Sequence, residues 1–272
     1  MMTGVTRRGL LLGGAGLALA ACSAKTVLPG HRATVVSGTS ASAAMGGIAV
    51  GWSIAYPKGH GPGSDLPVVV SLHGKGGNHE TSFGQLHLDT VLGDVVAGGV
   101  APFAIASVDG GTDSYWHKRA DGTDAGAMLR DEFIPFLAKR GLDTDRIGFY
   151  GWSMGGYGAL LQVGRYKVST RAVAVSSPAL FTSAQNTAAG AFDSASDFDD
   201  NNVYGNPQWF GGDSLMINCG RSDPFFAATQ TFASGLSATP AGGFGAGGHD
   251  ATYWRSVAPA QFRFLGHQIT AT

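Results

Sequence analysis

Short apolar runs recur along the chain and alternate with longer amphipathic segments. A nearly continuous apolar run bounded by turn residues is typical of a strand buried on both faces of a sheet. Five such runs predict strands at 68–72, 103–108, 147–150, 172–175 and 215–217. An earlier strand is predicted at 48–56, because Pro57 stops the run there.

Between these runs, apolar residues recur with the 3.6-residue period of an α-helix. The pattern predicts helices at 86–97, 125–140, 154–163, 225–236 and 252–265. Strands that alternate with helices indicate an α/β fold, with a mostly parallel central sheet covered by helices on both faces. The segment at 181–210 is rich in Asp, Asn, Ala and Ser and breaks the rhythm. It is either a lid over the carboxyl edge of the sheet or a solvated insertion.

The first residues do not follow the pattern of the fold. Arg7 and Arg8 precede an apolar run that ends at Ala21 and is short for a bilayer span, so we interpret 1–21 as a twin-arginine export signal. Residues 19–22 resemble a bacterial lipobox, which would make Cys22 the lipidated N-terminus of the mature protein. The alternative is an ordinary cleaved signal with an incidental cysteine. We expect a tether at 22–32 and one domain at 33–272.

Composition narrows the classes of function. The chain has 272 residues, of which 44% are hydrophobic and 14% charged, and its net charge is −1. This is enough apolar material for one large core, and no run of Lys or Arg marks a nucleic-acid or anionic-lipid surface. Cys219 ends an apolar run, so we expect a small core residue there rather than a nucleophile.

The motif Gly-Trp-Ser-Met-Gly at 151–155 lies between a predicted strand and a predicted helix. A sharp strand-to-helix turn would lift the Ser153 hydroxyl above the sheet, and the Met154 N–H at the helix start would face a developing oxyanion. With 43 Gly in the chain, the motif alone is weak evidence. Its flanking elements make Ser153 the candidate nucleophile.

A serine nucleophile needs a base, and the base needs an orienting acid. In α/β folds with this turn the order is Ser, acid, His. Asp223 follows the run at 215–217, and His249 precedes the last helix. His267 competes as base but lies at the end of that helix. Four aspartates of the insertion compete as acid, and we expect them to be solvated: Asp193, Asp197, Asp199 and Asp200.

The loop at 73–77, His-Gly-Lys-Gly-Gly, directly follows the strand at 68–72. Its glycines allow the backbone to approach a substrate closely, and we expect the Lys75 N–H to be the second oxyanion donor. His73 in such a loop is more often structural than catalytic.

Two other motifs carry no function. Residues 243–248 match G-x-G-x-x-G, but no βαβ unit follows, which argues against dinucleotide binding. His79 and Glu80 begin the zinc-peptidase motif, but Phe83 stands where its second histidine belongs. We expect no metal site.

Five segments together resemble the esterase D and antigen 85 group of the α/β-hydrolases, which includes feruloyl and acetyl esterases. They are the motifs at 72–77, 108–116, 151–156, 219–223 and 248–254. The resemblance implies an α/β-hydrolase fold with about eight strands, no cofactor, Ser153 as nucleophile, His249 as base and Asp223 as orienting acid.

The resemblance also implies substrate contacts. Residues 109–116 would form one wall of the substrate site, with Tyr115 and Trp116 either beside the substrate or packed within the wall, and His73 and Gly74 would lie next to it. Gly156 follows the elbow where mycolyltransferases of this group continue with bulkier residues. This favours hydrolysis over transfer to a sugar.

The sequence therefore predicts a serine carboxylic ester hydrolase that acts through an acyl-serine intermediate on small or cell-envelope acyl esters, glycolipid esters included. It would be exported and either anchored to the outer face of the plasma membrane through Cys22 or secreted, without a nucleic-acid partner. One alternative is an acyltransferase that passes the acyl group to a carbohydrate hydroxyl. A second is a non-catalytic surface binding module.

Overall fold

The structure is a computed structural model that describes residue 1, residues 30–211 and residues 214–271. Cys22 and nearly all of the expected export signal and tether lie outside the described residues. Among the helices of the described part, none combines the length and the apolar character that crossing a bilayer requires.

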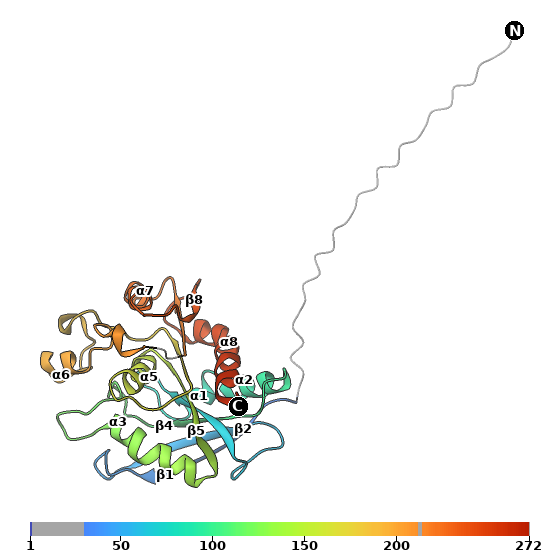
Figure 1. Ribbon diagram of the computed structural model, residues 1–272, viewed down its shortest axis with the longest axis horizontal. Coiled ribbons are helices and arrows are strands. Elements are labelled where there is room, and N and C mark those ends of the chain that lie inside the picture. The colour runs from blue at the N-terminus through green and yellow to red at the C-terminus, as the bar shows by residue number, and fades with distance from the viewer. Residues whose placement is uncertain (2–29, 212–213, 272) are drawn as a thin grey trace.

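Eight strands form one sheet in the order β1-β2-β4-β3-β5-β6-β7-β8 (Figure 1). Strand β2 pairs antiparallel with β1 and β4, whereas all pairs from β4 through β3 to β8 are parallel. This confirms the mostly parallel sheet. The strands are β1 (Thr34–Ala41), β2 (Ala49–Tyr56), β3 (Leu66–Leu72), β4 (Ala104–Val108), β5 (Leu142–Trp152), β6 (Ala172–Ser176), β7 (Leu215–Gly220) and β8 (Ala241–Gly245).

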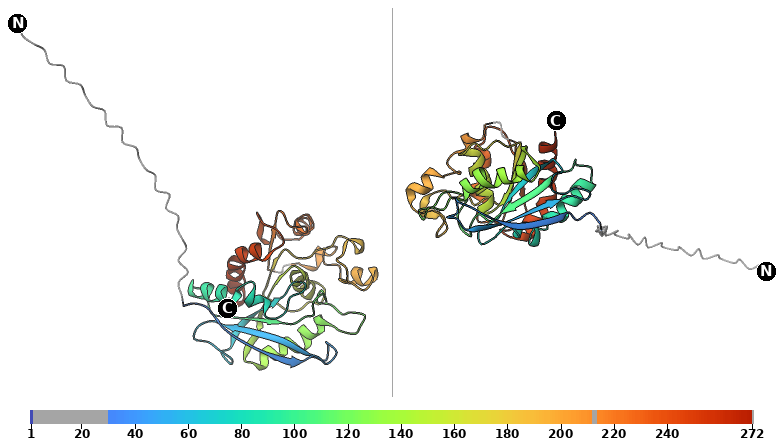
Figure 2. Two further views of the ribbon diagram at one scale, coloured as in Figure 1. Left: turned by 180° about the vertical axis from the view of Figure 1, so that it is seen from behind. Right: turned by 90° about the horizontal axis from the view of Figure 1, so that it is seen from below.

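Helices cover both faces of this sheet (Figure 2). One face carries α2 and α8, and the other carries α5 with the continuous run of α3, η1 and α4. The helices are α1 (Thr81–Gly84), α2 (Leu88–Ala97), α3 (Ala125–Ala127), η1 (Met128–Phe133), α4 (Ile134–Lys139), α5 (Met154–Gly164), η2 (Ala184–Asn186), α6 (Ala195–Asp200), η3 (Pro207–Trp209), α7 (Phe226–Ser234) and α8 (Ala251–Thr270).

Strand β3 contributes side chains to the hydrophobic cores on both faces of the sheet. Its side chains alternate, so that Val68 and Val70 pack on the side of α5, whereas Val69 packs on the side of α8 with Phe262. All seven residues of β3 are buried. A strand with two buried faces has few polar positions, Ser71 being the one in β3, which is why these strands appear in the sequence as nearly continuous apolar runs.

Both edge strands were absent from the elements predicted by the apolar pattern. Strand β1 has an exposed face, and β8 has the sequence Ala-Gly-Gly-Phe-Gly, in which no residue is buried. An edge strand pairs on one side only and carries little apolar material. Its formation therefore depends on a neighbouring strand that local sequence does not reveal.

The insertion at 181–210 packs on the fold through aromatic rings. Phe192 lies 5.8 Å from Tyr115 and 5.9 Å from Tyr157, measured between ring centroids. A polar contact adds to this packing, because Arg119 forms an ion pair with Asp193 at 2.8 Å and donates to the Gly190 carbonyl. The insertion at 181–210 is therefore packed against the fold, and whether it touches a substrate stays a prediction.

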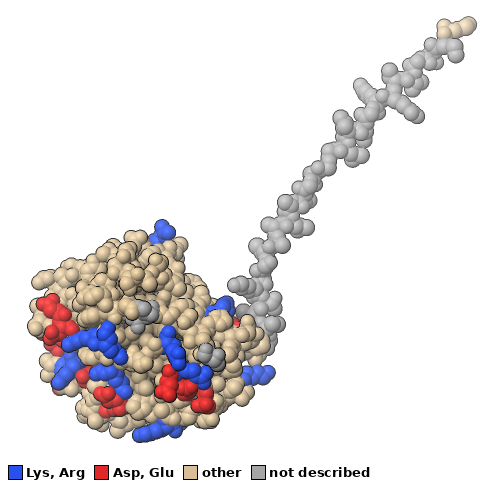
Figure 3. Space-filling view, viewed as in Figure 1, with Lys and Arg blue, Asp and Glu red and all other residues tan. Residues whose placement is uncertain are grey.

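Charged residues of both signs lie side by side on the face shown in Figure 3, and much of the remaining surface there is uncharged. Where positive and negative side chains are neighbours on this face, their fields largely cancel at a distance.

Candidate active site

The candidate catalytic residues all follow parallel strands. Ser153 comes directly after β5, Asp223 lies in the loop after β7, and His249 lies in the loop between β8 and α8. Because the carboxyl ends of parallel strands meet at one edge of the sheet, three segments far apart in sequence converge there.

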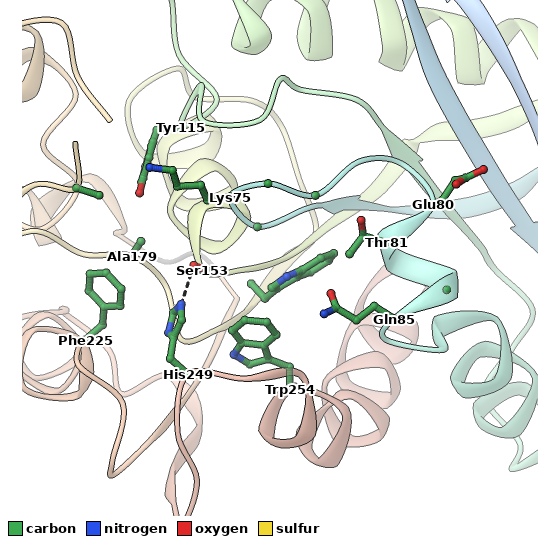
Figure 4. Close-up of a pocket in the computed structure, with 16 residues that line it drawn as sticks. Lys75, Glu80, Thr81, Gln85, Tyr115, Ser153, Ala179, Phe225, His249 and Trp254 are labelled. Atoms are coloured by element: carbon green, nitrogen blue, oxygen red, sulfur yellow. Dashed lines mark hydrogen bonds between the residues drawn. The ribbon is translucent and has the colours of Figure 1, made fainter. Parts of the chain in front are cut away.

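The structure brings these three side chains into one hydrogen-bonded chain. The His249 Nε2 atom lies 2.8 Å from the Ser153 Oγ atom, as Figure 4 shows, and His249 Nδ1 lies 2.9 Å from Asp223 Oδ2. An imidazole that donates from Nδ1 to a carboxylate leaves Nε2 as the acceptor for a serine hydroxyl. The geometry is therefore that of a nucleophile, a base and an orienting acid.

The backbone at Ser153 adopts a conformation that L-residues rarely take, with φ 54° and ψ −121°. Such a conformation costs on the order of 1–3 kcal/mol and persists only when its surroundings enforce it. Here the Ser153 N–H donates to the Ser176 carbonyl at 3.0 Å, and the Ser153 carbonyl accepts from Ala179 N–H at 3.0 Å. The turn is thus held by β6 and the residues that follow it.

Two glycines make this turn sterically possible. A Cβ atom at Gly151 would lie 2.2 Å from the Gly155 carbonyl oxygen, and one at Gly155 would lie 1.9 Å from the Leu72 carbonyl oxygen. Neither contact can be relieved by a side-chain rotation, because both partners are backbone atoms. The two glycines of the Gly-x-Ser-x-Gly pattern are therefore required because the backbones of β5, β3 and the start of α5 approach closely.

Asp223 is buried and stays ionised. Burial alone would raise the pKa of its carboxyl group, but hydrogen bonds from His249 and the Phe225 N–H, together with the nearby Ser177 hydroxyl, lower this pKa below the usual value. A carboxylate that remains negative can fix the imidazole tautomer and stabilise the imidazolium that forms when Ser153 loses its proton.

The His249 ring lies between two aromatic side chains. Its centroid is 5.3 Å from that of Phe225 and 5.1 Å from that of Trp254. These contacts limit rotation of the imidazole and leave its side chain 24% exposed. Neither residue was a predicted site residue, although Phe225 follows the acid by two positions and Trp254 lies in the first turn of α8.

Two backbone N–H groups close to Ser153 in the fold are the expected oxyanion donors. Met154 is the first residue of α5, so its N–H has no carbonyl one turn earlier within the helix. Lys75 lies in the loop after β3, and within the described residues its N–H donates to no other group. Both N–H groups are therefore free to donate, but their role as oxyanion donors stays a prediction, and the dipole of α5 adds to the positive potential at its N-terminus.

His73 supports this loop from behind. Its Nδ1 lies 2.9 Å from the Gly74 carbonyl oxygen, and its Nε2 accepts from Gly110 N–H at 3.0 Å. Burial lowers the pKa of the imidazole, so it stays neutral with the proton on Nδ1. The expected substrate contact of His73 is wrong, because the ring is completely buried and does not line the cleft.

Tyr115 and Trp116 have opposite roles. Both residues have positive φ, at 48° and 60°, so they turn the loop after β4 sharply. Trp116 is completely buried against His73, and its expected substrate contact is also wrong. Tyr115 instead lines the cleft that contains Ser153, as does Gly74, so the substrate contact of these two residues stays a prediction.

This cleft has a volume of about 850 Å³. Figure 4 shows Ser153 near its middle. On one side lie Tyr115, Ala179 and Phe225, which we call the Tyr115 end, and on the other lie Glu80, Thr81 and Gln85, which we call the Glu80 end. Ala188 of the insertion also lines the cleft, so the insertion helps to shape it.

The rival residues lie elsewhere. His267 is exposed in the last turn of α8. None of the four aspartates of the insertion lines the cleft. Cys219 is buried, and burial raises the pKa of its thiol to about 12, so it is the inert core residue that the sequence predicted. In the described part of the chain, His, Cys, Asp and Glu form no cluster suited to a metal ion.

Gly155→Ala should reduce kcat/KM by about 100-fold, because its Cβ atom would push the turn away from β3 and misplace Ser153 by a fraction of an ångström to an ångström. Steady-state kinetics with 4-nitrophenyl butyrate measures the effect. Gly61→Ala is the matched control, since a Cβ atom there meets nothing within 4 Å. Unchanged kinetics in Gly155→Ala would contradict the steric account.

Asp223→Asn should lower kcat by on the order of 10⁴, because an amide cannot hold the imidazole in the correct tautomer or stabilise its charged form. The same ester assay checks this, with exposed Asp145→Asn as the control expected to match the wild type. A loss smaller than about tenfold would remove Asp223 from the role of orienting acid.

The sequence and the fold were also compared with those of known proteins. No protein-family model matches the chain, and no curated protein sequence does. Among solved structures, a ferulic acid esterase superposes with a TM-score of 0.75 at 20% identity, covering 87% of this chain and 98% of its own. The fluorophosphonate-binding serine hydrolase FphF of Staphylococcus aureus has a TM-score of 0.71 at 16% identity, covering 86% and 99%. An S-formylglutathione hydrolase from Agrobacterium tumefaciens has a TM-score of 0.72 at 12% identity, covering 88% and 97%. The chain has the fold of these enzymes, the α/β-hydrolase fold.

Proposed function

We propose that the protein is a serine carboxylic ester hydrolase that acts through an acyl-Ser153 intermediate. The observation that carries this proposal is the chain of hydrogen bonds from Ser153 through His249 to Asp223 at 2.8 and 2.9 Å. A non-catalytic binding module would have no need for all three groups in this geometry at the mouth of a cleft.

In the first half of the reaction, Ser153 Oγ attacks the ester carbonyl carbon while His249 Nε2 takes the hydroxyl proton. The carbonyl oxygen becomes an oxyanion, which the N–H groups of Met154 and Lys75 stabilise by hydrogen bonds. When the intermediate collapses, the bond to the alcohol oxygen breaks, and protonated His249 gives its proton to that oxygen. The alcohol leaves and the acyl group stays on Ser153.

In the second half, a water molecule attacks the acyl-Ser153 carbonyl carbon, and His249 takes a proton from the water. Collapse of this second intermediate returns the proton to Ser153 Oγ and releases a carboxylic acid. Asp223 keeps its negative charge throughout and compensates the charge on the imidazolium.

The structural neighbours support the reaction class more than any one substrate. Their names refer to ferulic acid and to S-formylglutathione, which differ in acyl group and in the atom that leaves. The proposal therefore commits to acyl transfer from an ester to water. A carbohydrate hydroxyl in place of water would give the transferase alternative.

A fluorophosphonate probe should add its mass once to the intact wild-type protein, and Ser153→Ala should abolish both this adduct and hydrolysis of 4-nitrophenyl butyrate. Ser222→Ala is the control, because Ser222 is exposed beside Asp223 yet lies outside the cleft. Ester hydrolysis that survives in Ser153→Ala would refute the mechanism. A new ester formed with trehalose as acceptor would instead establish the transferase.

We also propose that the protein is exported and anchored by a lipid on Cys22, as the twin arginines and the lipobox-like residues 19–22 suggest. A bacterial host with a twin-arginine pathway should place the full chain in its membrane fraction and incorporate labelled palmitate. Cys22→Ser should abolish the label and release the protein to a soluble fraction, whereas Cys219→Ser should retain it. A palmitate label that persists in Cys22→Ser would exclude this anchor.

A further inference from the structure

The Tyr115 hydroxyl is a hydrogen-bond donor without a partner in the described part of the chain. The residue is only 3% exposed, yet it lines the cleft that contains Ser153. Burial, with a contribution from the Asp113 carboxylate, raises the pKa of Tyr115 to about 12, so the phenol keeps its proton. The Tyr115 hydroxyl is not among the fully buried side-chain atoms without a partner, so it opens to the cleft and is satisfied by whatever occupies the cleft.

The Lys75 ammonium lies at the same end of the cleft (Figure 4). The loop that carries Lys75 is joined to the loop that carries Tyr115, because Gly76 N–H donates to the Thr112 carbonyl at 2.6 Å. Lys75 Nζ donates to the Ala189 carbonyl at 3.1 Å, which uses one of its three N–H groups. Two further donors therefore remain for a ligand.

Charge is distributed unevenly along the cleft. Of the residues that line it, Lys75 at the Tyr115 end is the cation and Glu80 at the opposite end is the carboxylate. Asp113 lies near Tyr115 but is exposed and outside the lining of the cleft. Arg119, which is close to Asp113, is paired with Asp193. An anionic group in the cleft is therefore attracted to the Tyr115 end and repelled from the Glu80 end.

The rest of the Tyr115 end is apolar and includes Ala179 and Phe225. An alkyl chain there would pack well but would strip water from the Tyr115 hydroxyl without replacing its hydrogen bond. Leaving a buried donor unpaired in this way costs about 1–3 kcal/mol. A substrate with a hydrogen-bond acceptor at the matching position avoids this loss.

We propose that the Tyr115 hydroxyl and the Lys75 ammonium form a recognition site for a carboxylate carried by the ester substrate, at the end of the cleft away from Glu80. This inference rests on the proposed ester hydrolysis and names the substrate class for that reaction, an ester with a free acid group. The carboxylate can belong to the acyl half or to the alcohol half of the ester. In either case the Tyr115 hydroxyl and the Lys75 ammonium would bind it.

Two matched ester pairs distinguish these sources. For the acyl half, 4-nitrophenyl hydrogen adipate is compared with 4-nitrophenyl methyl adipate. For the alcohol half, 4-(butyryloxy)benzoate is compared with its methyl ester. The measured quantity is the ratio of kcat/KM for the acid to kcat/KM for the neutral ester. This ratio is internal to each variant, so a partly folded preparation does not change it.

In one of the two pairs, Lys75→Met and Tyr115→Phe should each lower this ratio by about tenfold, since each removes a hydrogen bond to a charged group. Lys75→Met keeps the backbone N–H that faces the oxyanion. Lys58→Met and Tyr204→Phe are the matched controls outside the cleft, and both should keep the wild-type ratio within about twofold.

Ratios that stay at the wild-type value in both variants and both pairs would overturn the recognition site while leaving ester hydrolysis intact. A wild-type protein that releases no nitrophenol from 4-nitrophenyl butyrate would instead overturn the proposed function. The two failures are therefore distinguishable in one set of assays.

Discussion

The backbone turn at Ser153 is the constraint on which the rest of the site depends. The turn is conformationally strained and persists because neighbouring backbone holds it. The Ser153 N–H donates to a carbonyl of β6, and the Ser153 carbonyl accepts an N–H from the segment after β6. Strand β3 lies so close to position 155 that only glycine fits there. The long helix α8 reinforces β6 in turn, because Gln261 donates to the Val175 carbonyl and bonds the Ser176 hydroxyl. Catalytic geometry is thus a property of the packed sheet rather than of the elbow alone.

The central strands and the triad could be predicted because their signals are local. A strand buried on both faces must be apolar at nearly every position, and the sequences of β3 and β6 have this pattern. The sharp turn needs glycine on both sides of Ser153, which leaves a visible motif. The order of acid and base then follows from the order of the strands, and this order identified Asp223 and His249 before any distance was known.

The remainder depends on contacts between distant residues, which local patterns do not encode. Strand β8 has five residues and three glycines, and it forms because β7 offers it a partner. Likewise, His73 and Trp116 lie in segments that surround the cleft, yet their side chains turn into the core. Which side chain of a loop faces the substrate is decided by packing on the loop's other side, and a single sequence does not state it.

The insertion at 181–210 helps to shape the cleft but supplies none of the proposed catalytic groups. It supplies Ala188 to the cleft and aromatic rings to its outer wall, but it contributes neither a triad residue nor an oxyanion donor. It is joined to the fold by ring packing, by the pair of Arg119 and Asp193, and by the Ala189 carbonyl, which accepts from Lys75 Nζ; none of these contacts involves a triad side chain. Under the proposed function, substitutions in this segment would therefore change which substrates enter the cleft while leaving Ser153, His249 and Asp223 in place, so new preferences could evolve without rebuilding the triad.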